Sequence, residues 1–354
     1  MARIVVAGGG AVGASIAYHL ALGGAGDVVL AELGTIASGS TGRAMGGIRQ
    51  QFSTAAEVRL AQESIDFFED LGPDLFQQVG YLFLATTEAG LGSLEERQAL
   101  QTGLGVPVER LDRREVEALA PGVFAGDVLG GFVCRRDGVA DPPAVTRELV
   151  GRLVELGVDV LEGTPEQNVG AEVRVLACGA YSAEAAARYD VELPVRPLVR
   201  QLFDTTPIRG LSERLPMILE AESGFHFRRY GGSLRVAMHD PEPRWGFEPS
   251  VDQAILPERL ERLARRFPAA AGARVGRAWA GLYDMTPDAH PIIGFVADGV
   301  YAACGFSGHG FMQSPAVGRA VAEELLEGES ALDLSPYRLE RFAAGSGFPE
   351  EVVL

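Results

Sequence analysis

The residues with the clearest chemical meaning lie near the N-terminus, where the stretch Gly8-Gly9-Gly10-Ala11-Val12-Gly13 is followed 19 residues later by Glu32. The first glycine permits a tight turn, the third lets the backbone approach a pyrophosphate, and the last lets a helix pack closely on a strand. A carboxylate at the distance of Glu32 hydrogen-bonds ribose hydroxyls. The spacing predicts a dinucleotide site formed by Gly8, Gly10, Ala11, Val12, Gly13, Glu32 and Leu33.

The flanking residues predict the elements that must position this motif. Residues 3–7 are a short β-branched run typical of a buried parallel strand, residues 14–22 carry small and apolar side chains at helical spacing, and residues 27–32 form a second strand. A helix that begins at the glycines directs its partial positive charge at a phosphate. The order strand, glycines, helix, strand and acid therefore predicts a true nucleotide site, but it does not choose between FAD and NAD.

The overall composition excludes several kinds of chemistry. The 354 residues include 31 arginines and no lysine, and 48 acidic side chains bring the formal net charge to −17. Without lysine there is no Schiff base, no P-loop lysine and no lysine base, because arginine does not give up its proton. An acidic chain also lacks the electrostatic footprint of a partner for nucleic acid or anionic lipid. We expect about two domains and a small-molecule substrate.

The cysteines and the N-terminal apolar stretch bear on the compartment. Cys134, Cys178 and Cys304 are odd in number and far apart, which is typical of free thiols in a reducing cytoplasm, and no Cys-x-x-Cys pair indicates a metal site. Residues 4–26 contain no acidic or basic side chain other than one histidine, which superficially resembles a signal peptide or a membrane span. Their seven glycines suit a nucleotide fold better. We therefore expect a cytoplasmic protein without bound metal or a membrane span.

The rest of the chain predicts an interrupted nucleotide domain. Alternating strands are expected at residues 80–86, 197–205, 224–230 and 233–239, strands that return to the parallel sheet at 173–178 and 300–304, and helices at 55–70, 142–156 and 316–327. This interleaving favours a flavin, because the nucleotide domain of most NAD dehydrogenases is contiguous. We predict an α/β (α+β) fold whose Rossmann-like FAD-binding domain has a parallel sheet and is interleaved with an antiparallel-sheet substrate domain. The expected FAD-binding segments are 1–79, 140–194 and 283–354, and the substrate-binding segments are 80–139 and 195–282.

Five further stretches follow the glycine fingerprint along the chain: Ser38-Gly-Ser-Thr-Gly-Arg-Ala-Met-Gly-Gly-Ile-Arg-Gln-Gln-Phe52, Asp137-Gly-Val-Ala-Asp-Pro142, Ala177-Cys-Gly-Ala-Tyr-Ser182, Trp279-Ala-Gly-Leu-Tyr-Asp-Met-Thr-Pro-Asp288 and Gly305-Phe-Ser-Gly-His-Gly-Phe311. In this collinear order the sequence resembles the FAD-dependent D-amino-acid, glycine and sarcosine oxidase family, and it is most similar to the β subunits of L-proline dehydrogenase and sarcosine oxidase. The resemblance implies oxidation of the C–N bond of a small secondary or primary amino acid to an imine, by hydride transfer to flavin N5. Between residues 161 and 178 the chain is shorter than is usual in that family.

The resemblance also implies roles for individual residues. Arg49 matches the arginine that holds the substrate carboxylate, although a solvated arginine is the alternative, and His239 matches an active-site histidine. Tyr283 and His226 are further polar candidates for the pocket. The loop from Gly305 is expected to cradle the flavin ring, with His309 either catalytic or bonded to the backbone. Besides the fingerprint, the cofactor contacts expected are Ser40, Thr41, Gly47, Ala177, Cys178, Gly179, Tyr181, Gly281, Gly305, Phe306, Ser307, Gly308, His309, Gly310, Phe311 and Met312.

Three departures from the sarcosine oxidases bear on mechanism. Arg235 and Met312 stand where those enzymes have lysines, and Gly281 stands where the flavin-tethering cysteine is found. We therefore expect non-covalent FAD, a cationic Arg235 beside the flavin, and a dehydrogenase with an unidentified electron acceptor. The alternatives are an oxidase that releases hydrogen peroxide and a flavin-binding subunit that is inactive alone. A second subunit or a homo-oligomer is a possible partner.

Overall fold

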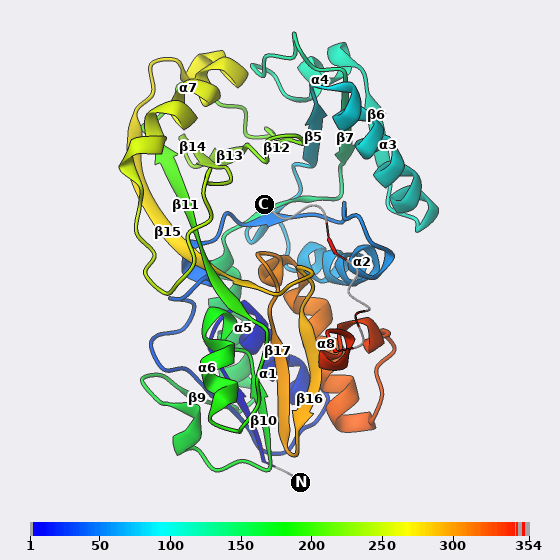
Figure 1. The fold of residues 1–354 in the computed structure, drawn as a ribbon, viewed down its shortest axis with the longest axis vertical. Coiled ribbons are helices and arrows are strands. Elements are labelled where there is room, and N and C mark those ends of the chain that lie inside the picture. Colours follow the sequence, from blue (N-terminus) through cyan, green and yellow to red (C-terminus); the bar gives the residue numbers. More distant parts are fainter. Residues whose placement is uncertain (1–2, 344, 346–348, 351–354) are drawn as a thin grey trace.

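A computed structural model describes residues 3–343, 345, 349 and 350. Its first layer is a six-stranded sheet in the order β16-β17-β10-β1-β2-β9, in which all neighbours run parallel except β16 and β17. This sheet occupies the lower half of Figure 1, beside helices from both ends and the middle of the chain. Its strands are β1 (Ile4–Ala7), β2 (Val28–Ala31), β9 (Asp159–Leu161), β10 (Val173–Leu176), β16 (Ile292–Ala297) and β17 (Val300–Cys304).

Helices pack against this sheet with unusually close contacts. A Cβ added at Gly318 of α8 would lie 2.7 Å from the backbone of Ser15 in α1, so the glycine lets the two helices approach. Ile16, Leu20, Val317 and Val321 then join one apolar core with the buried face of the strands. The helices of this half are α1 (Ala11–Leu22), α2 (Ala55–Asp70), α5 (Pro142–Glu155), α6 (Ser182–Ala187) and α8 (Gly310–Glu327).

The second layer is an eight-stranded sheet in the order β15-β11-β14-β13-β12-β5-β7-β6, in the upper half of Figure 1. Its pairs are antiparallel except for β12 and β5, which run parallel and come from two distant chain segments. The long strands β11 and β15 extend from this sheet down toward the first one (Figure 1). The strands are β5 (Tyr81–Ala85), β6 (Val108–Leu111), β7 (Gly130–Cys134), β11 (Arg196–Thr205), β12 (Met217–Glu220), β13 (His226–Tyr230), β14 (Ser233–Ala237) and β15 (Val275–Met285).

The remaining elements cover or connect these sheets. Helices α3 (Glu88–Gly103), α4 (Arg113–Leu119) and α7 (Leu256–Arg266) belong to the upper half. A small three-stranded sheet has the order β3 (Gly47–Ile48), β8 (Gly138–Ala140) and β4 (Phe76–Gln77).

Most expected elements occur, and the largest difference is at the start of the last helix. Asp141 caps α5 by accepting from the N–H of Ala144, and Pro142 is at the first helical turn, as predicted. Helix α8 begins at Gly310, six residues before the expected start. Pro315 removes one helical N–H, but the Ser314 hydroxyl donates to the carbonyl of Phe311 at 2.9 Å, so the carbonyl that the proline leaves without its helical donor is still bonded.

Candidate functional site

The glycine fingerprint forms the turn between β1 and α1, where side chains would not fit. Gly8 has φ +109°, and a Cβ there would lie 2.3 Å from the carbonyl oxygen of Ala177 at the end of β10. A Cβ on Gly13 would lie 1.9 Å from the carbonyl oxygen of Gly8. The N-terminus of α1 is therefore held against the ends of the parallel strands, which is where dinucleotides bind in such sheets.

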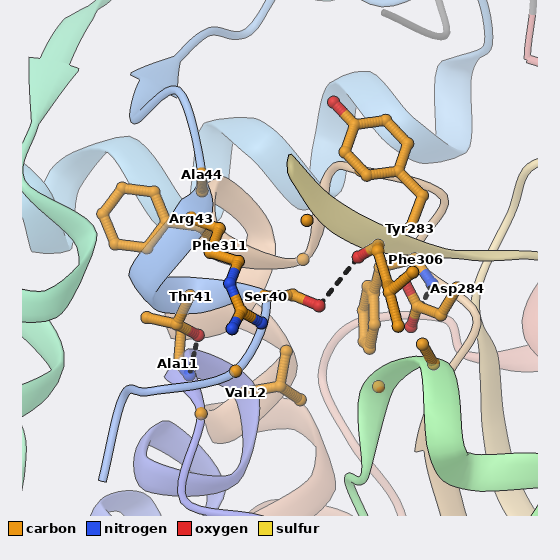
Figure 2. A pocket seen from close by; sticks show the side chains of 18 of the residues that line it. Ala11, Val12, Ser40, Thr41, Arg43, Ala44, Tyr283, Asp284, Phe306 and Phe311 are labelled. Atoms are coloured by element: carbon orange, nitrogen blue, oxygen red, sulfur yellow. Dashed lines mark hydrogen bonds between the residues drawn. The ribbon is translucent and has the colours of Figure 1, made fainter. Parts of the chain in front are cut away.

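Glu32 follows β2 and is oriented by the backbone. Its two carboxylate oxygens accept from the N–H of Gly9 at 2.6 Å and from that of Gly34 at 2.7 Å. Across the turn, the hydroxyl of Thr41 accepts from the N–H of Ala11 at 3.0 Å, as Figure 2 shows. Both contacts fix polar groups at the edge of one cavity that Gly10 and Ala11 also line.

The cavity, of about 610 Å³, runs from these glycines to the sheet formed by β11 and β15. All of the residues predicted to contact cofactor or substrate line it except Gly13, Arg235, His239, Gly305 and Ser307. Gly281 is part of the wall.

Asp284 organises the loop that begins at Gly305. One of its carboxylate oxygens accepts from the N–H groups of Gly305 at 2.8 Å and Phe306 at 3.1 Å, and its own carbonyl accepts from Ser307. Burial raises the pKa of Asp284 to about 6, while the backbone donors act in the opposite direction. Figure 2 places Asp284 and Phe306 together at one side of the cavity. After this loop α8 starts, so its positive end faces the cavity wall at His309 and Gly310.

Arg49 is the most deeply buried cation of the site. Its side chain is 1% exposed, its guanidinium carbon lies 4.2 Å from the Phe52 ring centre, and it lines the cavity. Nη1 donates to the carbonyl of Gln51 at 2.7 Å, and Nη2 donates to Nε2 of His309 at 3.2 Å. Because a guanidinium only donates, Nε2 of His309 accepts here and carries no proton.

A buried carboxylate holds the segment that carries Arg49. Asp137, which precedes β8, accepts from the backbone N–H and side-chain amide of Gln50, both at 3.0 Å, and from the amide of Gln51 at 3.1 Å. Burial raises the pKa of Asp137 to about 6, and these amide donors oppose the shift. The two residues that follow Arg49 are thus held by Asp137, which orients the backbone that carries Arg49.

His226 is a further polar group at the same end of the cavity. His226 on β13 is 3% exposed, and its Nδ1 lies 2.7 Å from the carbonyl of Gly224, so Nδ1 carries the proton and Nε2 is an acceptor. Burial lowers the pKa of His226 to about 4, and the charges of His239, Arg49 and Arg200 add to the lowering. His226 is therefore neutral near pH 7.

Arg200 on β11 was missed by the sequence analysis. It lines the cavity, with its guanidinium carbon 5.6 Å from the ring centre of Tyr283. Burial raises the pKa of Tyr283 and of Tyr81, so both hydroxyls stay protonated at this end of the cavity. The one signal for Arg200 in the sequence is the alternation of β11, and that signal gives no reason to prefer it over other arginines.

Arg235 and His239 lie elsewhere. Arg235 forms a bidentate ion pair with Asp204 at 2.8 and 3.1 Å and stacks between the rings of Tyr230 and Trp279, outside the cavity wall. The ring of His239 packs against Gly224, and its carbonyl accepts from Arg259 at 3.1 Å. The structure therefore brings together Arg49 and Tyr283 with His226 and Arg200, and it leaves Arg235 and His239 outside the group.

Among the described residues, no group of three or more histidine, cysteine, aspartate or glutamate side chains could hold a metal ion. No helix in the described ranges has both the length and the apolar character needed to cross a bilayer.

The donor set fits FAD. Gly8 and Gly10 leave room for a pyrophosphate at a helix N-terminus, Glu32 is placed to accept from a ribose, and the loop after Gly305 presents backbone toward the far end of the cavity. Fold and cavity thus define a dinucleotide-binding protein with a second sheet over the reacting end of its cofactor. The family profile described as "DAO: FAD dependent oxidoreductase" matches residues 3–324, and the chain belongs to this family.

Individual relatives agree with this assignment. The chain is 30% identical to FAD-dependent oxidoreductase domain-containing protein 1 of Bos taurus, over 99% of this chain and 87% of that protein. It is 26% identical to the sarcosine oxidase subunit beta of an Arthrobacter species, over 97% and 91% of the two chains. The crystal structure of L-proline dehydrogenase from P. horikoshii superimposes with a TM-score of 0.87 at 30% identity, covering 97% of this chain and 98% of that one.

Proposed function

We propose that this protein uses non-covalently bound FAD to oxidise the C–N bond of a small amino acid to an imine. The observation that carries the proposal is a buried arginine, Arg49, in the wall of the cavity that begins at the dinucleotide fingerprint. A guanidinium at that place suits a carboxylate, because it offers paired donors. The relatives named for sarcosine and proline support a substrate of the same kind.

Arg49 binds the substrate carboxylate and sets the position of the α carbon. Its guanidinium is already fixed by Gln51 and His309, so little side-chain entropy is lost on binding. Tyr81 and Tyr283, both protonated, are hydrogen-bond donors to the same end of the substrate. When bound, FAD supplies the acceptor for the hydride that leaves the α carbon.

The substrate amine must bind in its neutral form, with its extra proton released to solvent, before the α hydrogen leaves as hydride. Arg49 and Arg200 disfavour an ammonium group beside them, so they lower the pKa of the bound amine. His226 offers its unprotonated Nε2 as a hydrogen-bond acceptor for the neutral amine, and its own low pKa makes it an acceptor rather than a store for the proton. We assign these roles to His226 and Arg200 in place of His239 and Arg235.

The loop from Gly305 and the start of α8 stabilise the reduced cofactor. Backbone N–H groups and the positive helix end favour negative charge on the ring, in the way a helix N-terminus favours any anion. Asp284 keeps the loop in place through Gly305 and Phe306.

An anaerobic screen tests this function. Purified protein should be yellow, and its flavin should bleach when a suitable amino acid, N-methyl amino acid or proline analogue is added without oxygen. Bleaching by none of them would contradict the proposal and favour a flavin-binding subunit that is inactive alone. Denaturation in acid should release the flavin, because Gly281 supplies no thiol to tether it.

The electron acceptor is proposed to be other than oxygen. The cavity contains no ammonium group, since the chain has no lysine, and Met312 lines the wall where similar oxidases have one. Turnover in air as fast as turnover with an artificial dye, with one peroxide formed per amino acid, would instead identify an oxidase. We further propose a cytoplasmic protein with the domain segments predicted above, and sedimentation will show whether it forms a homo-oligomer or needs a second subunit.

A further inference from the structure

Arg200 is a partly buried cation in the wall of the cavity. Its Nε is buried and donates to no atom in the part of the chain that the structure describes. No ion pair to Arg200 is found among the described residues, whereas Arg235, Arg259 and Arg266 each have a carboxylate within 3 Å. A partly buried cation without a counter-charge destabilises the folded protein, and a bound anion would offset that cost.

The carboxylate whose charge acts on Arg200 is occupied by other donors. This carboxylate is Asp240. One of its oxygens accepts from the Gln201 amide at 3.0 Å and from Arg259 at 2.5 Å, and the other accepts twice from Arg244 at 2.9 and 3.2 Å. Asp240 therefore attracts Arg200 at a distance but is not its hydrogen-bond partner.

The fold directs Arg200 into the cavity. In the register of β11 and β15, Arg200 is opposite Gly281, against which the side chain of Arg43 packs, and its guanidinium extends toward Tyr283, two residues further along β15. The positive charges of Arg200 and Arg49 both act on His226 and on Tyr283. Arg49 and Arg200 thus act on the same end of the cavity: Arg49 is hydrogen-bonded to the protein, and Arg200 packs on Tyr283 without an ion pair among the described residues. Arg43 and Arg188 line the cavity as well, and Arg188 pairs with Glu166.

We propose that the substrate carries a second carboxylate, which pairs with Arg200 while Arg49 holds the α-carboxylate. The substrate class is an amino diacid, in which the oxidised C–N bond lies between two acidic groups. This inference rests on the proposed function, because it names the substrate of the same site. It also explains why a chain of net charge −17 places two cations together in a partly buried chamber.

Binding of non-reacting acids tests the proposal without turnover. Calorimetry on the holoprotein compares acids of equal carbon number: malonate with propanoate, succinate with butanoate, and glutarate with pentanoate. At least one diacid should bind about tenfold to hundredfold more tightly than its matched monoacid, the range of one hydrogen-bonded charge pair. Equal or weaker binding of all three diacids would overturn the proposal.

Three variants locate the effect. R200Q should raise the ratio of the diacid Kd to the matched monoacid Kd about tenfold or more, and R200K, which keeps the charge, should raise it less. The control is R196Q, because Arg196 is an exposed arginine on the same strand, stacked 4.4 Å from Trp245. R196Q should keep the wild-type ratio. If R200Q weakened both acids equally and shifted the flavin spectrum, Arg200 would serve the cofactor, and the proposal would be wrong.

Flavin reduction separates this proposal from the function on which it rests. Aspartate should reduce the flavin with a higher kcat/KM than alanine, or N-methylaspartate than N-methylalanine, and R200Q should remove most of that difference. Reduction by amino acids with no preference for the diacids would refute the amino-diacid class alone. No reduction by any of them would refute the proposed function itself.

Discussion

Removing the charge of Arg49 should weaken substrate binding far more than cofactor binding. The side chain is 1% exposed, and its two outer nitrogens already bond Gln51 and His309, so its position does not depend on the ligand. A substrate carboxylate would add two charge-assisted hydrogen bonds, each contributing on the order of 1.5–3 kcal/mol. Allowing for desolvation, R49M should lose about 3 kcal/mol of binding, or roughly a 100-fold rise in Kd.

The matched variant R49K keeps the charge but loses the planar fork of donors, so its Kd should rise about tenfold. The assay is anaerobic stopped-flow, in which the dependence of flavin bleaching on substrate concentration gives Kd separately from the rate of hydride transfer. FAD content, measured by absorbance, should stay at the wild-type level in both variants, because the fingerprint and Glu32 are at the other end of the cavity.

Thermal unfolding provides the control on folding. R49M also removes two internal hydrogen bonds, so the free energy of unfolding should fall by about 1–2 kcal/mol. A wild-type Kd for substrate in R49M, with the protein folded and yellow, would refute the assignment of the carboxylate to Arg49.

Three other predictions concern the cofactor, the pH dependence and Arg235. G8A should abolish FAD retention on gel filtration, because φ +109° and a carbonyl 2.3 Å from the new Cβ both exclude a side chain; full FAD content would contradict this. His226 has a pKa of about 4 when folded and about 6.5 when unfolded, so the unfolded chain binds more protons between these values and stability falls as pH drops from 6.5 to 4. The fall is worth about 3 kcal/mol from this group, and H226Q should lose that part in urea titrations across the window; an unchanged pH profile would show that His226 is not buried as a neutral ring. R235M should lower the free energy of unfolding by about 2–4 kcal/mol by leaving Asp204 without its cation, while the rate of flavin reoxidation by oxygen stays at the wild-type value; a changed reoxidation rate would place Arg235 beside the flavin after all.

Local patterns predicted the nucleotide half of the fold well. The glycines, the β-branched run before them and the acid after the second strand are constraints on neighbouring residues, and β1, α1 and β2 follow from them. Asp141 and Pro142 likewise set the start of α5. The predicted start of α8 was six residues too late, because Pro315 normally marks a helix boundary. Here the Ser314 hydroxyl donates to the carbonyl that the proline cannot serve, and the helix continues through it.

Long-range pairing was beyond local patterns. The parallel pair of β5 and β12 joins residues 136 positions apart, and no periodic pattern in the sequence predicts this pairing. The same holds for the site. His226 and Arg200 were not chosen in the sequence analysis as the main catalytic pair, whereas His239 and Arg235 were, although the two histidines and the two arginines look alike as residue types.

The sequence by itself predicted a dinucleotide site and excluded lysine chemistry, because these follow from spacing within one chain segment and from residue identity. Its resemblance to the flavin-dependent amine oxidoreductases rests on motifs in the same order along the whole chain. Only the tertiary structure decided which arginines face the cavity. The effect of an arginine depends on the position of its guanidinium, which is set by strand register and by nearby carboxylates. Asp204 holds Arg235 outside the cavity wall. Arg200 lies opposite Gly281 and faces the cavity, because Asp240 is already bonded to other donors.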